Sequence, residues 1–215
     1  MAKWGMVIDL KKCIGCYACM ITCKQVHFLP PNMFWNRILV DEIGEYPQVR
    51  KRIYPILCNQ CAEAPCIAVC PSGASIKRED GIVMIDSTKC VGCGYCQVAC
   101  PYQQRSFYEG EKEYFAGQGF TELEVIGREL YPLTKGVVVK CNFCSERIDM
   151  GIRKGLKIGV DREATPACVN NCPAKARHFG DLNDPNSEVS KLIRQRKGFP
   201  LHEEFGTSPS VYYVD

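Results

Sequence analysis

The chain has 215 residues, 46% of them hydrophobic, and a formal net charge of +3, so it is long enough for one large globular domain or two small ones. Its 27 Lys and Arg residues are scattered and form no basic block with interleaved aromatics, which argues against a nucleic-acid-binding protein. Its 16 cysteines follow no apolar leader segment, which argues against a secreted disulfide scaffold and for metal binding in a reducing compartment. No apolar run is long enough to cross a bilayer, so we expect any membrane contact to come through a partner.

A first cysteine group follows a short apolar strand that we predict over residues 4–10. The group consists of Cys13, Cys16, Cys19 and Cys23. A helix is expected to continue from Cys23 to residue 28 and to end at Pro30, because proline lacks a backbone donor and breaks a helix. Residues 30–52 contain three prolines and are expected to form an irregular connector.

The second and third cysteine groups are joined by a predicted hairpin. A strand over residues 53–57 leads into the second group, which consists of Cys58, Cys61, Cys66 and Cys70, followed by Pro71. Strands over residues 72–76 and 82–85 flank Asp80-Gly81, a tight-turn signal. The third group consists of Cys90, Cys93, Cys96 and Cys100, followed by Pro101. Its spacing is the iron-sulfur run C-x2-C-x2-C-x3-C-P, in which the fourth thiolate usually ligates a different cluster from the first three.

The chain contains an internal duplication. When residues 6–23 are laid over residues 83–100, all four cysteines coincide, and Gly15 coincides with Gly92. Glycine suits a loop that wraps around a cluster, because it adds no side chain to the loop. The duplication therefore predicts two structurally similar cluster-binding segments.

The last cysteine group follows a long segment without cysteines. Residues 106–135 are expected to form a surface insertion, and both a passive loop and a partner-facing flap stay open. A strand predicted over residues 137–140 leads into the group, which consists of Cys141, Cys144, Cys168 and Cys172, followed by Pro173. In isolation the two cysteine pairs suit a zinc site. However, the ending at Cys172 repeats those at Cys70 and Cys100, which favours iron-sulfur ligation.

No catalytic constellation is visible in the chain. Residues 183–215 are expected to form a tail, with a short helix near residues 189–195 followed by extended chain, that packs on the rest of the protein or on a partner. No Ser-His-Asp, paired-carboxylate or phosphate-loop pattern stands out. We interpret His27 and His178 as structural residues, not as ligands or proton relays. The chain is thus expected to have no active site of its own.

Four cysteine groups in this order, with the opening Met6-Val7-Ile8-Asp9 and the segments Pro166-Ala167-Cys168-Val169 and Phe179-Gly180-Asp181-Leu182, resemble one known family. Over nearly its whole length the chain is similar to the four-cluster ferredoxin-like electron-transfer subunits of the molybdopterin oxidoreductases, which include polysulfide, thiosulfate, dimethyl sulfoxide and arsenate reductases. The resemblance implies four [4Fe-4S] clusters with crossed ligation. The first set would be Cys13, Cys16, Cys19 and Cys172; the second Cys23, Cys141, Cys144 and Cys168; the third Cys58, Cys61, Cys66 and Cys100; and the fourth Cys90, Cys93, Cys96 and Cys70.

The resemblance also implies an α+β fold with two ferredoxin-like 2×[4Fe-4S] modules made of short strands, short helices and long loops. Residues 1–29 and 136–182 would form the first module, which is discontinuous in sequence, and residues 53–105 the second. Residues 30–52 would connect them, and residues 106–135 and 183–215 would be the insertion and the tail. In such relatives the first set lies nearest to the pterin subunit, and the fourth lies nearest to the point where electrons leave the iron-sulfur subunit.

The function implied by the resemblance is the relay of single electrons between a large molybdopterin or tungstopterin catalytic subunit and a membrane quinone-linked anchor or another redox partner. The pterin would belong only to the partner subunit. Two alternatives stay open: the small subunit of a soluble two-subunit pterin enzyme of the transhydroxylase type, and a polyferredoxin associated with a hydrogenase or formate dehydrogenase. We expect a location peripheral to the membrane within a complex, or in the cytoplasm; export with a signal-bearing partner would place the protein on the periplasmic face.

Overall fold

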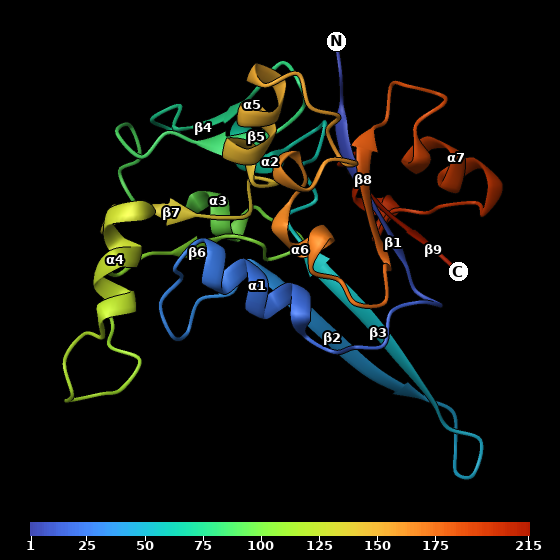
Figure 1. Cartoon of the computed structure of the whole chain (residues 1–215), viewed down its shortest axis with the longest axis horizontal. Coiled ribbons are helices and arrows are strands. Elements are labelled where there is room, and N and C mark those ends of the chain that lie inside the picture. Colours follow the sequence, from blue (N-terminus) through green and yellow to red (C-terminus); the bar gives the residue numbers. More distant parts are fainter.

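The computed structural model describes all residues from 1 to 215 as short strands and short helices separated by long loops (Figure 1). The strands are β1 (Trp4–Asp9), β2 (Asn36–Ile43), β3 (Arg50–Leu57), β4 (Ser75–Lys77), β5 (Val83–Ile85), β6 (Ser106–Phe107), β7 (Val138–Val139), β8 (Arg177–Asp181) and β9 (Val211–Val214). The helices are α1 (Ala18–Val26), α2 (Pro65–Ala68), α3 (Tyr95–Val98), α4 (Glu122–Leu130), α5 (Ser145–Arg153), α6 (Ala167–Asn170) and α7 (Glu188–Gln195), with two 3-10 turns, η1 (Arg162–Ala164) and η2 (Glu203–Phe205). Short helices combine with small sheets whose strand pairs are antiparallel except β1 with β9, which is compatible with the predicted α+β class.

A three-stranded sheet joins the two ends of the chain. β1 lies in its middle, antiparallel to β8 and parallel to β9. Alternate side chains of β1 point to opposite faces: Met6 and Ile8 enter the main core, whereas Val7 packs with Val189 of α7. Every residue of β1 is buried, because both faces of the sheet are covered. The strand predicted over residues 4–10 and the helix predicted near residues 189–195 are both confirmed.

The end of the tail is an integral part of this sheet. The segment expected only as extended chain ends in β9, which pairs with β1. Just before β9, the backbone N–H of Ser210 donates to the carbonyl oxygen of Asn59 (2.8 Å), and the N–H of Ala62 donates to the carbonyl oxygen of Ser208 (2.9 Å). The tail therefore ties the sheet to the second cysteine group.

Residues 36–57 form a long two-stranded hairpin, so the expectation of an irregular connector over residues 30–52 is wrong for most of that segment. β2 and β3 pair antiparallel along their whole length, from Asn36 opposite Leu57 to Ile43 opposite Arg50. The prolines that indicated irregular chain lie before β2 or in the turn between the strands, where they remove no ladder hydrogen bond. The hairpin projects away from the rest of the molecule (Figure 1).

Two parts of the fold repeat one motif. β4 and β5 form the hairpin predicted before the third cysteine group, and α2 packs against α3. β8 and β1 pair in the same antiparallel way, and α6 packs against α1. In the loops that follow β1 and β5, Gly15 and Gly92 both adopt a left-handed backbone, with φ of 66° and 71°. A Cβ at Gly92 would also overlap the carbonyl oxygen of Gly136, which explains the glycine there.

The insertion over residues 106–135 has a packed base. Its helix α4 begins at a capping box in which Thr121 and Glu124 satisfy each other's backbone N–H groups. Before this helix, the hydroxyl of Tyr114 donates to the carbonyl oxygen of Leu29, 2.6 Å away, just beyond α1. The insertion is therefore held against the end of α1 and lies at the edge of the molecule (Figure 1).

Gly127 of α4 lies against Phe28, and a Cβ added there would overlap the phenyl ring. Gly127→Ala is expected to destabilise the insertion by up to about 2 kcal/mol, since overpacking costs about 1–3 kcal/mol and the gain in helix propensity is about 1 kcal/mol. Faster proteolysis within residues 106–135 would report the change. Glu129→Ala, at an exposed position of the same helix, is the matched control and should leave the cleavage rate unchanged. Equal cleavage rates for the two variants would contradict the expected clash.

Candidate metal centres

The first cysteine set surrounds one cavity. Cys13, Cys16 and Cys19 come from the loop between β1 and α1 and from the start of α1, and Cys172 comes from the chain just after α6. These four residues line a cavity with about 350 Å³ of empty space, partly open to solvent. Cys23, the last cysteine of the same run, is not among the lining residues. The structure therefore brings together thiols from distant parts of the chain.

The fourth set repeats this arrangement in the other half of the molecule. Cys90, Cys93 and Cys96 line a similar cavity, with about 310 Å³ of empty space that is partly open to solvent, together with Cys70 from the second cysteine group. Cys100, which ends the same run, does not line it. In both cavities, three thiols of one run therefore meet a single thiol from another run.

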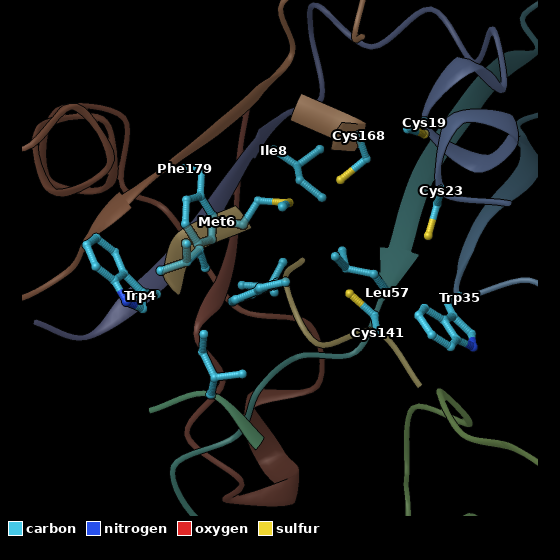
Figure 2. Close-up of a cluster of buried hydrophobic side chains, with 14 of the residues drawn as sticks. Trp4, Met6, Ile8, Cys19, Cys23, Trp35, Leu57, Cys141, Cys168 and Phe179 are labelled. Carbon is cyan, nitrogen blue, oxygen red and sulfur yellow. The ribbon is translucent and has the colours of Figure 1, made fainter. Parts of the chain in front are cut away.

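The second set is the most deeply buried. Its four cysteines have exposed fractions between 4% and 6%: Cys23, Cys141, Cys144 and Cys168. Figure 2 shows Cys23, Cys141 and Cys168 reaching toward one region beside Leu57. Burial raises the pKa of Cys23 to about 12, and the charge of Cys168 adds to the rise. Such thiols ionise only when a cation lies among them, and a bound metal supplies that charge.

The third set also combines two runs. Burial is the main cause that raises the pKa of Cys61 to about 12, and the charges of Cys58, Cys66 and Cys100 contribute. Cys100 thus lies within the field of the second cysteine group, although it belongs to the third group in sequence.

Each of the four sets lies close to at least one other set. Burial raises the pKa of Cys19 in the first set, and the charge of Cys168 in the second set adds to it. Burial likewise raises the pKa of Cys141 in the second set, with a contribution from Cys58 in the third set. The third and fourth sets share one neighbour, Arg105. Neighbouring sets are therefore close enough to influence each other electrostatically.

Backbone donors aimed at sulfur show that these thiols suit a metal-bound, anionic state. The hydrogen bonds run from Ser75 to Cys70 (3.4 Å), from Gln104 to Cys100 (3.5 Å) and from Ala176 to Cys172 (3.3 Å). Burial opposes ionisation of Cys70, but the hydrogen bonds from Ser75 and Ser72 outweigh it and lower the pKa to about 7. Hydrogen bonds to the sulfurs are one of the ways in which proteins tune iron-sulfur clusters. The donor sets therefore fit [4Fe-4S] clusters.

Three buried cations beside the cysteines were not singled out in the sequence, where they look like any other scattered charge. Arg105, Lys140 and Arg177 have exposed fractions of 6%, 5% and 4%. Lys140 Nζ donates to the carbonyl oxygens of Cys141 (2.9 Å) and Val83. The sequence does contain a signal for the two arginines, because each lies the same number of residues after a cysteine that is directly followed by proline. Comparison of the two halves of the chain would have found them.

His27 also lies closer to the cysteines than its structural interpretation suggested. Its Nε2 atom lies 3.5 Å from Cys144 Sγ, and its ring centroid lies 4.8 Å from those of Trp35 and Tyr131. Burial, with the charge of Arg147, lowers the pKa of His27 to about 4, so the imidazole is neutral at pH 7. A neutral imidazole has one N–H to donate, and Cys144 is within reach of it. Sequence spacing holds no sign of this contact.

Converging cysteine sets, donors aimed at sulfur and buried cations define a ferredoxin-like protein that holds several iron-sulfur clusters. Residues 49–121 match the 4Fe-4S dicluster domain family. A Halobacterium salinarum protein named as an iron-sulfur subunit of a dimethyl sulfoxide reductase is 41% identical, with 100% of this chain and 80% of that protein covered. A selenate reductase subunit of Mesobacillus selenatarsenatis is 40% identical, covering 99% of this chain and 72% of the relative. The Hdr-like menaquinol oxidoreductase iron-sulfur subunit 1 of Archaeoglobus fulgidus is 34% identical, covering 99% and 83%.

The chain therefore belongs to the iron-sulfur electron-transfer subunits of the molybdopterin oxidoreductase family. It is the non-catalytic subunit of an oxidoreductase complex, holds multiple [4Fe-4S] clusters and works with a catalytic partner subunit. Among its own helices, none combines the length and the apolar character of a membrane span.

Proposed function

We propose that the chain holds four [4Fe-4S] clusters in the four crossed sets, within two ferredoxin-like modules formed by residues 1–29 with 136–182 and by residues 53–105. Support comes from the two cavities, each lined by three thiols of one run and one of another. It also comes from the repeated packing of α1 on α6 and of α2 on α3. The clusters supply single-electron transfer when bound. The chain's own residues bind them, exclude water from them and hold them in order.

The row of sets carries electrons between a pterin-bearing catalytic subunit at the first set and a membrane quinone-linked anchor at the fourth. The observation that carries this proposal is the exposure of the row: Cys16 and Cys93, at its two ends, are exposed, whereas the second set is wholly buried. Electrons therefore enter and leave through the ends. The anchor holds the protein at the membrane surface, and the relative named as part of a menaquinol oxidoreductase favours a quinone at that end.

An exposed apolar side chain lines the same cavity as the exposed cysteine at each end. Ile14, beside Cys16, is 65% exposed, and Val91, beside Cys93, is 69% exposed. The two residues occupy equivalent positions in the duplicated segments. Exposed apolar side chains grouped around a functional site are typical of partner-docking surfaces. Each end of the row therefore presents its own docking surface.

The proposal is tested on the whole complex, purified anaerobically from membranes. We expect about sixteen irons per chain, together with a pterin-bearing subunit and a membrane subunit. Ile14→Glu should release the pterin-bearing subunit and retain the membrane subunit, and Val91→Glu should do the reverse, because a carboxylate left unpaired in an interface costs about 3–5 kcal/mol. Each variant is the control for the other. About eight irons per chain, or identical subunit losses in the two variants, would contradict the proposal.

A further inference from the structure

Two buried arginines are paired with sulfur and have no carboxylate partner. Arg105 Nη2 lies 2.9 Å from Cys66 Sγ, and its Nη1 donates to the hydroxyl of Ser75 (2.9 Å). Arg177 Nη1 lies 3.5 Å from Cys168 Sγ and donates to Asn36 Oδ1 (2.9 Å). Neither guanidinium takes part in an ion pair with Asp or Glu. Because buried charges in proteins are paired, the sulfur atoms and whatever they bind are the counter-charge.

Each guanidinium faces two cysteine sets: besides its contact with Cys66 or Cys168, Arg105 lines the cavity of the fourth set and Arg177 lines that of the first. Burial lowers the pKa of Arg105, but the charges of Cys66 in the third set and Cys96 in the fourth outweigh it and raise the pKa. For Arg177, burial likewise lowers the pKa, but the charges of Cys168 in the second set and Cys19 in the first outweigh it and raise the pKa. The two arginines therefore occupy equivalent places, one between the clusters of each proposed module.

The duplication of the chain extends to these cations. Arg177 begins β8, and Arg105 directly precedes β6, each at the same separation from the proline-flanked cysteine before it, Cys172 or Cys100. The corresponding position after Cys70 is Ser75, which accepts a hydrogen bond from Arg105. Each proposed module thus has one guanidinium beside its two sets, Arg177 in the first module and Arg105 in the second.

We propose that Arg105 and Arg177 are positioning residues for electron transfer: each holds a fixed positive charge between two neighbouring clusters and raises the reduction potential of both. The inference rests on the proposed crossed ligation. An electron added to a buried cluster increases its negative charge, and a cation within hydrogen-bond distance of a ligand favours that state. A cation shared by two clusters therefore shifts both reduction potentials in the same direction.

The test is a redox titration of the whole complex followed by electron paramagnetic resonance. In Arg105→Gln, the equilibrium constants for reduction of the third and fourth clusters should each fall about tenfold or more, about 59 mV for a one-electron couple. The first and second clusters should keep their potentials. Arg177→Gln should give the mirror image, with lower potentials for the first and second clusters only. Iron content should match that of the unmodified complex.

Two further variants separate charge from structure. Arg194→Gln removes a cation whose guanidinium donates only to the carbonyl oxygen of Pro185 on the surface, and all four potentials should stay unchanged. Arg105→Lys keeps the charge, so most of the fall seen in Arg105→Gln should be absent. If the Gln variants lose iron, the Lys variants decide: potentials near those of the unmodified complex support the inference, and a tenfold fall overturns it.

Unchanged potentials in an iron-replete Arg105→Gln complex would overturn the inference, as would a change confined to one cluster. Failure of the crossed ligation is distinguishable, because it would show in the unmodified complex as fewer than about sixteen irons, or in Cys100→Ser as loss of a different cluster.

Discussion

Cys100→Ser is expected to remove the cluster held by Cys58, Cys61 and Cys66 and to spare the one held by the third cysteine run, to which Cys100 itself belongs. The reason is that Cys100 does not line the cavity of its own run, and that its charge acts on the pKa of Cys61 in the second cysteine group. Iron content should fall by about four per chain, because serine is a poor substitute for a thiolate. Electron paramagnetic resonance of the reduced complex, with one signal per cluster, would identify the missing one.

Cys70→Ser is the reciprocal variant and the sharpest control. Cys70 follows the second cysteine run in sequence, but it lines the cavity of Cys90, Cys93 and Cys96. Cys70→Ser should therefore damage the fourth cluster and spare the third. If each substitution damages the cluster of its own run instead, the crossed ligation is wrong, even though four clusters are present.

Signals that lie within a short stretch of sequence predicted much of this fold. Apolar runs predicted β1, apolar runs with a tight-turn signal predicted the β4–β5 hairpin, and a short helix was expected at α7, because each pattern is complete within a few residues. Cysteine spacing indicated cluster binding for a similar reason, since the ligand loop of a cluster tolerates few spacings. The partition of 16 thiols into sets came from resemblance, because the spacing alone does not say which distant thiol completes each set.

Features that depend on distant contacts were missed. The prolines around β2 masked a hairpin that is stabilised by pairing along its whole length, and β9 is a strand only because β1 lies beside it. The buried cations were hidden for another reason. Arg105 and Arg177 are polar residues whose partners are sulfur atoms, and only their equal separation from Cys100 and Cys172 distinguishes them from surface arginines.

Tyr213→Ala in β9 is expected to lower the free energy of unfolding by about 3–5 kcal/mol, a large part of the roughly 5–15 kcal/mol that is typical of a folded protein. Tyr213 is fully buried, its hydroxyl donates to the carbonyl oxygen of Pro55 (2.8 Å), and its ring packs edge-on against Tyr54. Truncation would leave a cavity where the tail, the sheet and β3 meet. Because metal sites break two-state unfolding, the measurement is the guanidinium concentration at which the cluster absorbance is lost under anaerobic conditions.

Tyr213→Phe separates the ring from the hydroxyl. It keeps the packing and leaves one buried carbonyl oxygen, that of Pro55, without its partner, at a cost of about 1–3 kcal/mol. Its midpoint of cluster loss should therefore lie between those of the unmodified protein and Tyr213→Ala. Loss of Tyr213 should release all clusters together, because β9 pairs with β1, which precedes the first set, and the tail before it contacts the second cysteine group. A midpoint for Tyr213→Ala equal to that of the unmodified protein would show that the tail is not needed to hold the cluster-binding loops together.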